Sequence, residues 1–359
     1  MIAASGLVET ARIHRRGEIR VAMEAPLGIR PGEVLLRVTA VGLCGSDLHW
    51  YEEAGIGDAR LVRPLVLGHE FAAVIAEGPR AGQRVVVDPA DNCGRCALCA
   101  AGRTNICEAI RFAGHGSTDG ALRAQMSWPA RLLHPIADSI TDDEAALLEP
   151  LGVALHALDL AAVTRRDRVG VYGCGPIGLL LVQLLRRAGV AAVVATDLLD
   201  HRVTAAKAMG ATLAFAVDGR DGADFTPGRL LAREQAVDVA LEAAGSNAAL
   251  SDALAAIRPG GRVVMVGIPQ GDRTAFEAGA ARRKELALLQ CRRMLPADLD
   301  RAIELAAAGK VSLSPLITHR YPLSRASEAF ETLAARSGLK VIVKASTDLI
   351  RSDLEETGA

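Results

Sequence analysis

The feature that most constrains the fold is a glycine-rich segment between an apolar run and a helical run. Gly173-Cys-Gly175-Pro-Ile-Gly178 follows the apolar residues 169–172 and opens the helical pattern of residues 177–188. The first glycine permits a tight turn, the second lets the backbone approach a pyrophosphate, and the third lets helix and strand pack closely. Free N–H groups at a helix start attract an anion. The segment predicts a strand-turn-helix unit for a dinucleotide. The alternative is the same turn in a sheet that binds nothing.

This segment belongs to a longer alternation of apolar strands and Ala/Leu-rich helices that begins near Arg168. Strands are expected at residues 192–195, 237–241 and 262–266, and helices at residues 201–209 and 247–257. Such alternation predicts parallel strands joined by helical crossovers. The Arg-Pro-Gly-Gly run at residues 258–261 predicts a break, because proline cannot continue a helix and glycine permits a turn.

Two further positions extend the predicted nucleotide site. Asp197 ends the second strand, where a carboxylate accepts hydrogen bonds from the adenosine ribose of NAD and repels a 2′-phosphate. Arg202 is expected to cover the adenine, although a solvated helix residue fits equally well. The full set of residues expected to bind NAD is Gly173, Gly175, Pro176, Ile177, Gly178, Asp197, Arg202, Val266 and Gly267.

The first part of the chain has a different texture. Short β-rich runs, such as residues 34–38 and 84–87, are separated by Gly and Pro, which predicts a small irregular β domain. After Gly267 the alternation weakens, with an amphipathic helix expected at residues 299–308 and short strands near residues 317 and 341–343. A chain of 359 residues fits two domains of common size. We expect the tail to return to the first domain, which would make that domain discontinuous.

Four cysteines lie close together in the first domain, at Cys93, Cys96, Cys99 and Cys107. Four thiolates complete a tetrahedral zinc shell without an open position, so the predicted site is structural. An iron–sulfur cluster or a redox pair uses the same residue type, but the spacing differs from the ferredoxin patterns. Cysteines in this arrangement favour metal binding in a reducing compartment over disulfides.

Charge and hydropathy narrow the possible partners. The 41 basic and 42 acidic residues give a net charge of −1, which offers no general attraction to nucleic acid or an anionic membrane. No apolar run reaches the roughly 20 residues of a membrane span, and no secretory leader is visible. Aromatic residues make up only 3% of the chain, too few to favour stacking on single-stranded nucleic acid. We expect a cytoplasmic protein with a small-molecule ligand.

Three more segments contain metal-ligating residue types: Cys44-Gly-Ser46-Asp47-Leu-His49, Gly68-His69-Glu70 and Glu149-Pro150. Each is weak alone, because a single Cys or His is more often a buried structural residue. Taken in order with the cysteine lobe and the glycine turn, they resemble the zinc-containing medium-chain dehydrogenase/reductase family. The resemblance is greatest to its polyol (sorbitol or L-iditol) dehydrogenase group and covers residues 31–343.

The resemblance implies an α/β protein with two zinc ions per chain and NAD. A GroES-like β-rich catalytic domain would span residues 1–152 and 290–359 and carry the structural-zinc lobe at 90–108, and a Rossmann domain with a doubly wound parallel sheet would span 153–289. Cys44, His69 and Glu70 would bind the catalytic zinc, and Glu149 would either ligate it or hydrogen-bond its water. Three protein ligands and an open position let zinc bind an alcohol and lower its pKa.

The resemblance also implies roles for neighbouring residues. Ser46 would take the alcohol proton and His49 would pass it toward solvent. Asp47 would either orient a ligand histidine or cap the following turn. Trp50, Arg292 and Arg293 are expected to contact substrate. A second arginine suits a carboxylate, although an exposed position is the commoner fate of an arginine.

These residues predict an enzyme that oxidises a secondary alcohol of a polyol of the sorbitol, xylitol or iditol type to a ketose, with transfer of hydride to NAD⁺. The alternative is L-idonate 5-dehydrogenase, or another hydroxy-acid or simple secondary alcohol dehydrogenase. A non-catalytic NAD-binding protein is less consistent with the intact ligand set. A zinc-stapled nucleic-acid-binding domain is disfavoured because Arg95 and Arg103 form no basic stripe. The family suggests a homo-oligomer, either a tetramer or a dimer.

Overall fold

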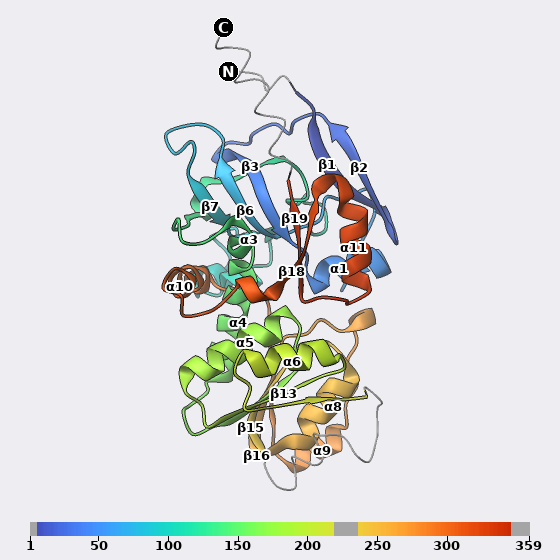
Figure 1. Ribbon diagram of the computed structural model, residues 1–359, viewed down its shortest axis with the longest axis vertical. Helices are drawn as coiled ribbons and strands as arrows, with labels where there is room; N and C mark the ends of the chain where they lie inside the picture. The colour runs from blue at the N-terminus through green and yellow to red at the C-terminus, as the bar shows by residue number, and fades with distance from the viewer. Residues whose placement is uncertain (1–5, 219–235, 346–359) are drawn as a thin grey trace. The chain divides into compact units, whose positions relative to one another are not determined.

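The computed structural model describes residues 6–218 and 236–345, and the chain divides into two compact units (Figure 1). The first unit comprises residues 1–149 and 313–359, and the second comprises residues 150–312. The first unit is therefore discontinuous, as the sequence predicted. In the described part of the chain, no helix has both the length and the apolar character needed to cross a membrane.

The boundary before the C-terminal segment differs from the expected one. Residues 290–312 belong to the second unit and not to the first. Two sets of contacts explain this placement. The Arg301 guanidinium donates to Asp159 at 2.6 Å, and Ser312 exchanges two hydrogen bonds with Gln183, at 2.8 and 3.0 Å.

Among the residues described for the second unit, six strands form one parallel sheet. The strand order is β14-β13-β12-β15-β16-β17, and every neighbouring pair is parallel. The strands are β12 (Arg168–Tyr172), β13 (Ala192–Asp197), β14 (Leu213–Ala216), β15 (Val237–Glu242), β16 (Ile257–Met265) and β17 (Ala287–Gln290). In the described part of this unit, the α-helices after α4 (Leu148–Ala161) are α5 (Pro176–Ala188), α6 (Asp200–Ala208), α8 (Asn247–Ala256), α9 (Ala278–Arg283) and α10 (Pro296–Ala307).

The strand order confirms the predicted doubly wound sheet. The chain enters at β12, adds β13 and β14 on one side, and then adds β15, β16 and β17 on the other. Right-handed crossovers in opposite directions place helices on opposite faces of a sheet. The direction changes between β12 and β15, and ligands of open parallel sheets bind beyond the carboxyl ends of the strands at such a point. The glycine turn follows β12 directly.

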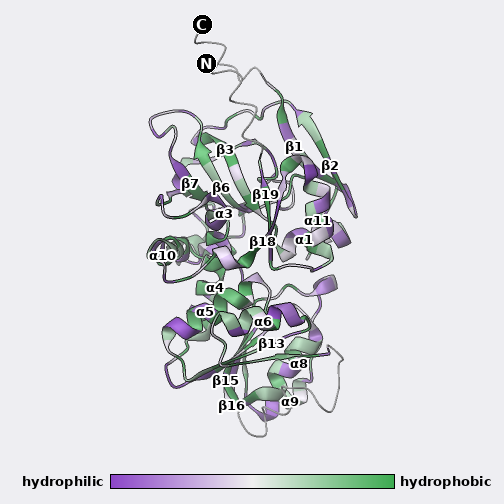
Figure 2. Cartoon of the chain, in the orientation of Figure 1, coloured by the Kyte–Doolittle hydropathy of each residue, from purple (hydrophilic) through white to green (hydrophobic). Residues whose placement is uncertain are grey.

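The strands are apolar because helices cover both of their faces. All six residues of β13 are buried, a pattern typical of parallel sheets. Figure 2 shows hydrophobic colouring along β13, β15 and β16 and mixed colouring along α5 and α6. Helix α5 begins at Pro176, a residue suited to the first turn, and ends at Gly189 with φ of 70°. Helix α8 begins where the side chain of Ser246 accepts from Ala249 N–H.

The expected break at residues 258–261 takes an unexpected form. Strand β16 begins at Ile257 and pairs with β15 along its length, but the register shifts within the run. Val237 pairs with Ile257, and the next paired residues are Val239 and Arg262. The intervening Pro-Gly-Gly run bulges out of the ladder, because proline has no N–H to donate to a strand and Gly260 adopts φ of 72°.

The first unit contains a mainly antiparallel sheet. Its order is β11-β7-β6-β3-β19-β18, and β10 also pairs with β3. Its strands are β3 (Glu33–Gly42), β6 (Glu70–Ile75), β7 (Arg84–Val87), β10 (Gln125–Pro129), β11 (Leu133–Pro135), β18 (Ile317–Pro322) and β19 (Lys340–Lys344). Separate strand pairs are β1 (Val8–Arg15) with β2 (Glu18–Glu24), β4 (Gly55–Ile56) with β5 (Ala59–Arg60), and β8 (Ala90–Asp91) with β9 (Arg111–Phe112).

Helices in this unit are short, apart from the one at the boundary. They are α1 (Gly45–Glu53), α2 (Ala97–Ala100), α3 (Asp142–Ala145) and α11 (Ala326–Ala334), and α4 (Leu148–Ala161) contains the boundary between the units. The apolar core includes Trp50, Phe71, Trp128 and Phe330, all at most 1% exposed. Strand β3 ends just before Cys44, and its Gly42 pairs with Glu70, the first residue of β6. The sheet therefore brings the two predicted ligand segments together.

Candidate active site

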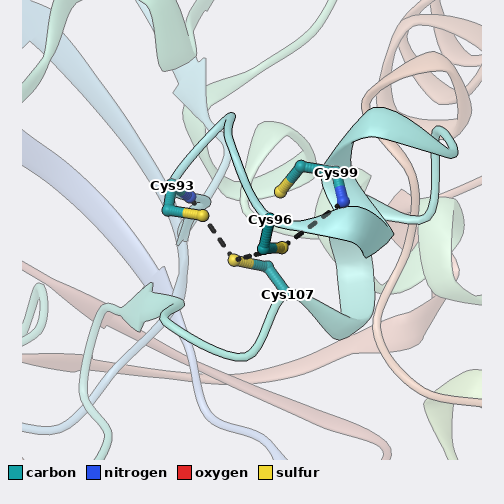
Figure 3. A group of neighbouring side chains, drawn as sticks. All are labelled: Cys93, Cys96, Cys99 and Cys107. Atoms are coloured by element: carbon teal, nitrogen blue, oxygen red, sulfur yellow. Dashed lines mark hydrogen bonds between the residues drawn. The ribbon is translucent and has the colours of Figure 1, made fainter.

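The four predicted lobe cysteines converge. Cys93, Cys96, Cys99 and Cys107 each offer a sulfur, and all four sulfurs lie within 4.8 Å of one another. Figure 3 shows these sulfurs turned toward one another around α2. The sulfurs of Cys96 and Cys107 are 3.9 Å apart, close to the edge of about 3.8 Å that a zinc–sulfur bond of about 2.3 Å gives in a tetrahedron. That separation is far beyond a disulfide bond of about 2.05 Å. The donor set therefore fits a closed zinc shell.

The electrostatics of the lobe are compatible with a bound cation. Backbone N–H groups of Arg95 and Cys96 lower the pKa of Cys93 to about 6, so this thiol is ionised at neutral pH. Burial and the adjacent thiols raise the pKa of Cys99 to about 12. Four thiolates can coexist at this spacing only when a positive ion offsets their charge.

A second ligand group begins at the start of α1. Cys44 occupies the N-cap of this helix, and its backbone N–H donates to the Asp47 carboxylate at 2.9 Å. The other oxygen of Asp47 accepts from Gly68 N–H at 3.3 Å and lies 3.6 Å from His69 Nδ1. Asp47 therefore closes the first turn of α1 and lies beside the ring of His69, which are the positions that its two predicted roles need.

Cys44, His69 and Glu70 form a compact set of ligand atoms within 4.8 Å of one another. His69 and Glu70 are buried, at 6% and 1% exposure. Sulfur, imidazole and carboxylate are the donor types that zinc takes at catalytic sites with three protein ligands. Burial raises the pKa of the Cys44 thiol, and the neighbouring Glu70 carboxylate adds to the rise, so a bound cation is needed to hold Cys44 as a thiolate. These residues fit a metal ion.

Glu149 lies outside this compact group. It is buried at the start of α4, and burial raises its pKa to about 8, with the Glu70 charge adding to the rise. Its carboxylate is not among the ligand atoms that lie within 4.8 Å of one another. In the described part of the chain, the arrangement therefore favours Glu149 as a neighbour of the ligand group.

Lys340 belongs to the site but was missed in the sequence. This residue opens β19, is 2% exposed, and its Nζ donates to a carboxylate oxygen of Glu70 and, at 2.9 Å, to the carbonyl of Leu43. Burial opposes its charge, but the interactions with Glu70, Cys44 and Glu149 together outweigh that effect and raise the pKa of Lys340. Lys340 therefore offsets the negative charge of Glu70. The only signal in the sequence is a lysine at the edge of an apolar strand.

The two predicted proton carriers lie on α1. The hydroxyl of Ser46 is 3.1 Å from Nε2 of His69, so Ser46 borders the ligand group. His49, one helical turn further on, forms a 2.7 Å hydrogen bond through Nδ1 with Glu53. An aromatic neighbour was also missed, since the ring of Phe112 lies 5.4 Å from the ring of His69.

The glycine turn of the second unit has the expected backbone. Gly173 adopts φ of 100°, which other residues rarely do, and a Cβ on Gly178 would lie 1.9 Å from the Gly173 carbonyl oxygen. Gly175 is the N-cap of α5 and lacks a side chain to satisfy the free N–H groups, with Pro176 and Ile177 following in the first turn. The helix start is therefore open to a phosphate.

Asp197 ends β13 beside this turn and is buried. Its two oxygens accept from Cys174 N–H at 2.7 Å and Leu199 N–H at 2.9 Å. Arg202 on α6 approaches the same carboxylate to 3.9 Å. Val266 and Gly267 follow β16, and their N–H groups donate to the Glu242 carbonyl, which ties the end of β16 to that of β15.

The predicted substrate residues are placed differently. Trp50 is 1% exposed within the core of the first unit and stacks edge-on with His115, so it packs against protein and does not line an open surface. Trp50 directly follows His49 on α1, and consecutive side chains of a helix point about 100° apart. Trp50 therefore faces the core although its neighbour does not. Arg292 and Arg293 lie in the second unit between β17 and α10, with Arg292 exposed and Arg293 at φ of 57°.

A three-ligand metal group, a closed thiolate lobe and a doubly wound nucleotide fold together define a zinc-dependent dehydrogenase. Two family models match the chain: an alcohol dehydrogenase GroES-like domain at residues 30–138 and a zinc-binding dehydrogenase at residues 176–308. Sorbitol dehydrogenase of Bacillus subtilis is 33% identical over 90% of this chain and 93% of its own. A probable D-xylulose reductase A of Aspergillus fumigatus is 35% identical over 89% and 91%.

Solved structures agree with this class. L-idonate 5-dehydrogenase from Escherichia coli superposes with a TM-score of 0.86 at 26% identity, covering 94% of this chain and 98% of its own. An alcohol dehydrogenase from Escherichia coli CFT073 in complex with NADH gives 0.84 at 26% identity, covering 95% and 100%. The chain belongs to the zinc-containing medium-chain dehydrogenase/reductase family and is an alcohol dehydrogenase that uses zinc and a nicotinamide cofactor.

Proposed function

We propose that the enzyme oxidises a secondary alcohol of a polyol to a ketone and reduces NAD⁺. One observation carries the proposal: the ligand atoms of Cys44, His69 and Glu70 lie within 4.8 Å of one another, with the Ser46 hydroxyl 3.1 Å from His69. The relatives named sorbitol dehydrogenase and D-xylulose reductase support a polyol as the substrate class.

The residues of the first unit prepare an alcohol for oxidation. A zinc ion held by Cys44, His69 and Glu70 would supply a Lewis acid that lowers the pKa of the alcohol, and NAD⁺ would accept the hydride. Ser46 takes the alcohol proton and gives up its own, and His49 is the base that passes a proton on toward water. Asp47 would orient the His69 ring through its charge, since one of its oxygens lies 3.6 Å from Nδ1 of that ring.

The coenzyme is NAD rather than NADP in this proposal. The buried Asp197 carboxylate lies at the end of β13 next to the glycine turn and accepts hydrogen bonds from two backbone N–H groups, which hold it in place. A carboxylate there accepts hydrogen bonds from the ribose hydroxyls and repels a 2′-phosphate.

We also propose a cytoplasmic homo-oligomer. All seven cysteines are free, as expected where thiols remain reduced.

The decisive experiment measures zinc per chain and, on the same sample, NADH formation from NAD⁺ with sorbitol, xylitol, L-idonate, threonine and a simple secondary alcohol. We expect a zinc ion for each of the two ligand groups and turnover on a polyol. Turnover on L-idonate alone would favour the hydroxy-acid alternative, which the likeness to L-idonate 5-dehydrogenase supports. Bound NADH without turnover on any alcohol would favour a non-catalytic NAD-binding protein.

Cys44→Ser tests the catalytic metal in the same assay. The variant loses a ligand of the three-residue group, so we expect the loss of one zinc ion per chain and of turnover, with NADH binding retained. Cys291→Ser is the matched control, because Cys291 lies outside both ligand groups and is also a free thiol. Full turnover of the Cys44 variant would show that the catalytic metal is misassigned.

A further inference from the structure

The hydrogen bond between His49 and Glu53 fixes which ring nitrogen carries a proton. His49 Nδ1 lies 2.7 Å from a carboxylate oxygen of Glu53, four residues further along α1. An ionised carboxylate only accepts hydrogen bonds, so Nδ1 must be the donor. The neutral imidazole then carries its lone pair on Nε2.

The position of Glu53 is unfavourable for the helix. Glu53 is the last residue of α1, and the final turn of this helix contains no basic residue. The C-terminal end of a helix carries a partial negative charge, so an acid there destabilises it. The contact with His49 is a favourable interaction at this position. The same helix carries Ser46 at its other end, beside the metal-ligand group.

We propose that Glu53 is a positioning residue for His49 in proton release, an inference that rests on the proposed function. The carboxylate holds the ring with Nδ1–H toward itself, so Nε2 receives the proton released by the alcohol. The resulting imidazolium keeps its Nδ1–H bond to Glu53, whose negative charge stabilises it, and the Nε2 proton then passes to water. Carboxylate–histidine pairs in hydrolases work by the same principle.

The solvent exposure of His49 and Glu53 limits the expected effect of Glu53 on kcat. The side chains of His49 and Glu53 are 13% and 33% exposed, so water weakens the charge interaction. A general base increases the rate by about a hundredfold or more. We expect Glu53 to account for a factor of about ten in kcat. Its contribution lies in ring orientation and in the charge of the imidazolium.

Glu53→Met and Glu53→Gln separate these contributions in the full-length, zinc-loaded enzyme. Glu53→Met removes the acceptor, so kcat should fall about tenfold while KM for NAD⁺ and for the polyol stays unchanged. Glu53→Gln keeps an acceptor but removes the charge, so its kcat should fall about threefold. Glu52→Met is the matched control, an adjacent acid of α1 that should retain full kcat. The thermal midpoint of each variant is measured beside kcat, so that a loss of folded protein is not mistaken for a loss of turnover.

A double-mutant cycle tests whether Glu53 acts through His49. Glu53→Met should cost nothing further in a His49→Gln background. The proposal is overturned if Glu53→Met leaves kcat unchanged or lowers it equally in both backgrounds.

A spectroscopic readout keeps this test independent of the proposed function. In ¹⁵N-histidine-labelled protein, the His49 ring, assigned by His49→Gln, should show a protonated Nδ1 in the wild type and a loss of that preference in Glu53→Met. If the wild type shows this tautomer but turns over no alcohol, the proposed function is refuted, and only the contact between His49 and Glu53 is confirmed. Turnover on a polyol with Nε2 protonated instead would refute the role of Glu53 alone.

Discussion

At the scale of single residues, the site depends on carboxylates whose two oxygens have different partners. Asp47 bonds the backbone of Cys44 with one oxygen and that of Gly68 with the other, so one buried side chain connects both ligand segments. Asp197 bonds Cys174 and Leu199 in the same manner in the second unit. Charged hydrogen bonds to backbone are strong when buried, which explains why aspartate occurs at both places.

The role of Asp197 gives a prediction about the coenzyme. Asp197→Ala removes the charge that repels a 2′-phosphate, so the ratio of kcat/KM for NADP⁺ to that for NAD⁺ should rise at least about tenfold, or about 1.4 kcal/mol. Steady-state kinetics with both coenzymes measure it. Asp200→Ala, which removes an exposed acid three residues away, is the control. An unchanged preference would remove Asp197 from the ribose site.

Asp88 gives a prediction about pH. This side chain is 3% exposed, and burial raises its pKa from 3.8 to about 6, although its Oδ1 accepts from Ala90 N–H at 2.9 Å. The folded state therefore holds the proton more tightly than the unfolded state. The contribution of Asp88 to stability is complete below about pH 4 and is lost as the pH rises through about 6.

Asp88→Asn keeps the acceptor and removes the charge. It should match the wild type near pH 4 and exceed it at pH 7, by at most about 3 kcal/mol for a shift of about two pKa units. Urea unfolding at several pH values provides the measurement, and the exposed Asp138→Asn should show no such trend. A variant less stable than the wild type at pH 7 would mean that the Asp88 charge is favourable.

At the scale of elements, helix ends are satisfied by different devices. Ser246 accepts from Ala249 N–H at the start of α8, and Gly189 ends α5 in the left-handed conformation. The end of α8 is unusual, because the ammonium of Lys284 donates to three carbonyl oxygens, those of Leu254, Ala255 and Ile257, at 2.7 to 2.9 Å. A lysine from another element thus satisfies the last carbonyls of this helix.

Lys284→Met should therefore destabilise the second unit. Removing the donor leaves several carbonyls near the end of α8 without their partner, and hydrogen bonds from a charged donor contribute about 1.5–3 kcal/mol. We expect a loss of that order in the free energy of unfolding, measured by urea denaturation. Lys207→Met, at the exposed end of α6, should change stability by less than about 0.5 kcal/mol. Equal effects of the two substitutions would contradict the capping role.

We propose that the cysteine lobe is held by a metal ion as well as by ion pairs. Arg111 bonds Asp91 at 2.9 Å and Glu33 at 2.8 Å, and its guanidinium lies 4.6 Å from the centre of the Trp128 ring. These contacts join the base of the lobe to strands β3 and β10, and the lobe itself has few apolar residues to bury. Metal binding then supplies the stability that a core would give.

At the scale of the whole molecule, each unit has its own core and its own ligand chemistry. The metal ligands all belong to the first unit, and the glycine turn belongs to the second. Damage to the lobe should therefore affect the first unit most. Cys99→Ser should lower its stability and yield, while NADH binding by the second unit persists, as calorimetry and NADH fluorescence would report. A well-folded Cys99 variant that lacks only turnover would argue against a structural lobe.

Local signals in the sequence predicted much of this architecture. Glycine and proline mark turns where a positive φ or a missing N–H is required, and the glycine turn and the predicted helices α5 and α8 are confirmed. Cysteine spacing predicted the convergence of the lobe sulfurs, because ligands from one short loop need little help from the rest of the fold. The short apolar runs at residues 84–87 and 192–195 also predicted strands β7 and β13.

Tertiary structure decided what depends on partners distant in the chain. Lys340 reaches Glu70 across 270 residues, through the pairing of β19 and β6 with β3, and hydrophobic periodicity does not reveal which strands pair. Packing likewise placed Trp50 in the core and residues 290–312 in the second unit. The sequence by itself determined the turns, the lobe and the kinds of ligand. The fold decided which charges meet, because the energy of a buried charge depends on the neighbours that tertiary pairing supplies.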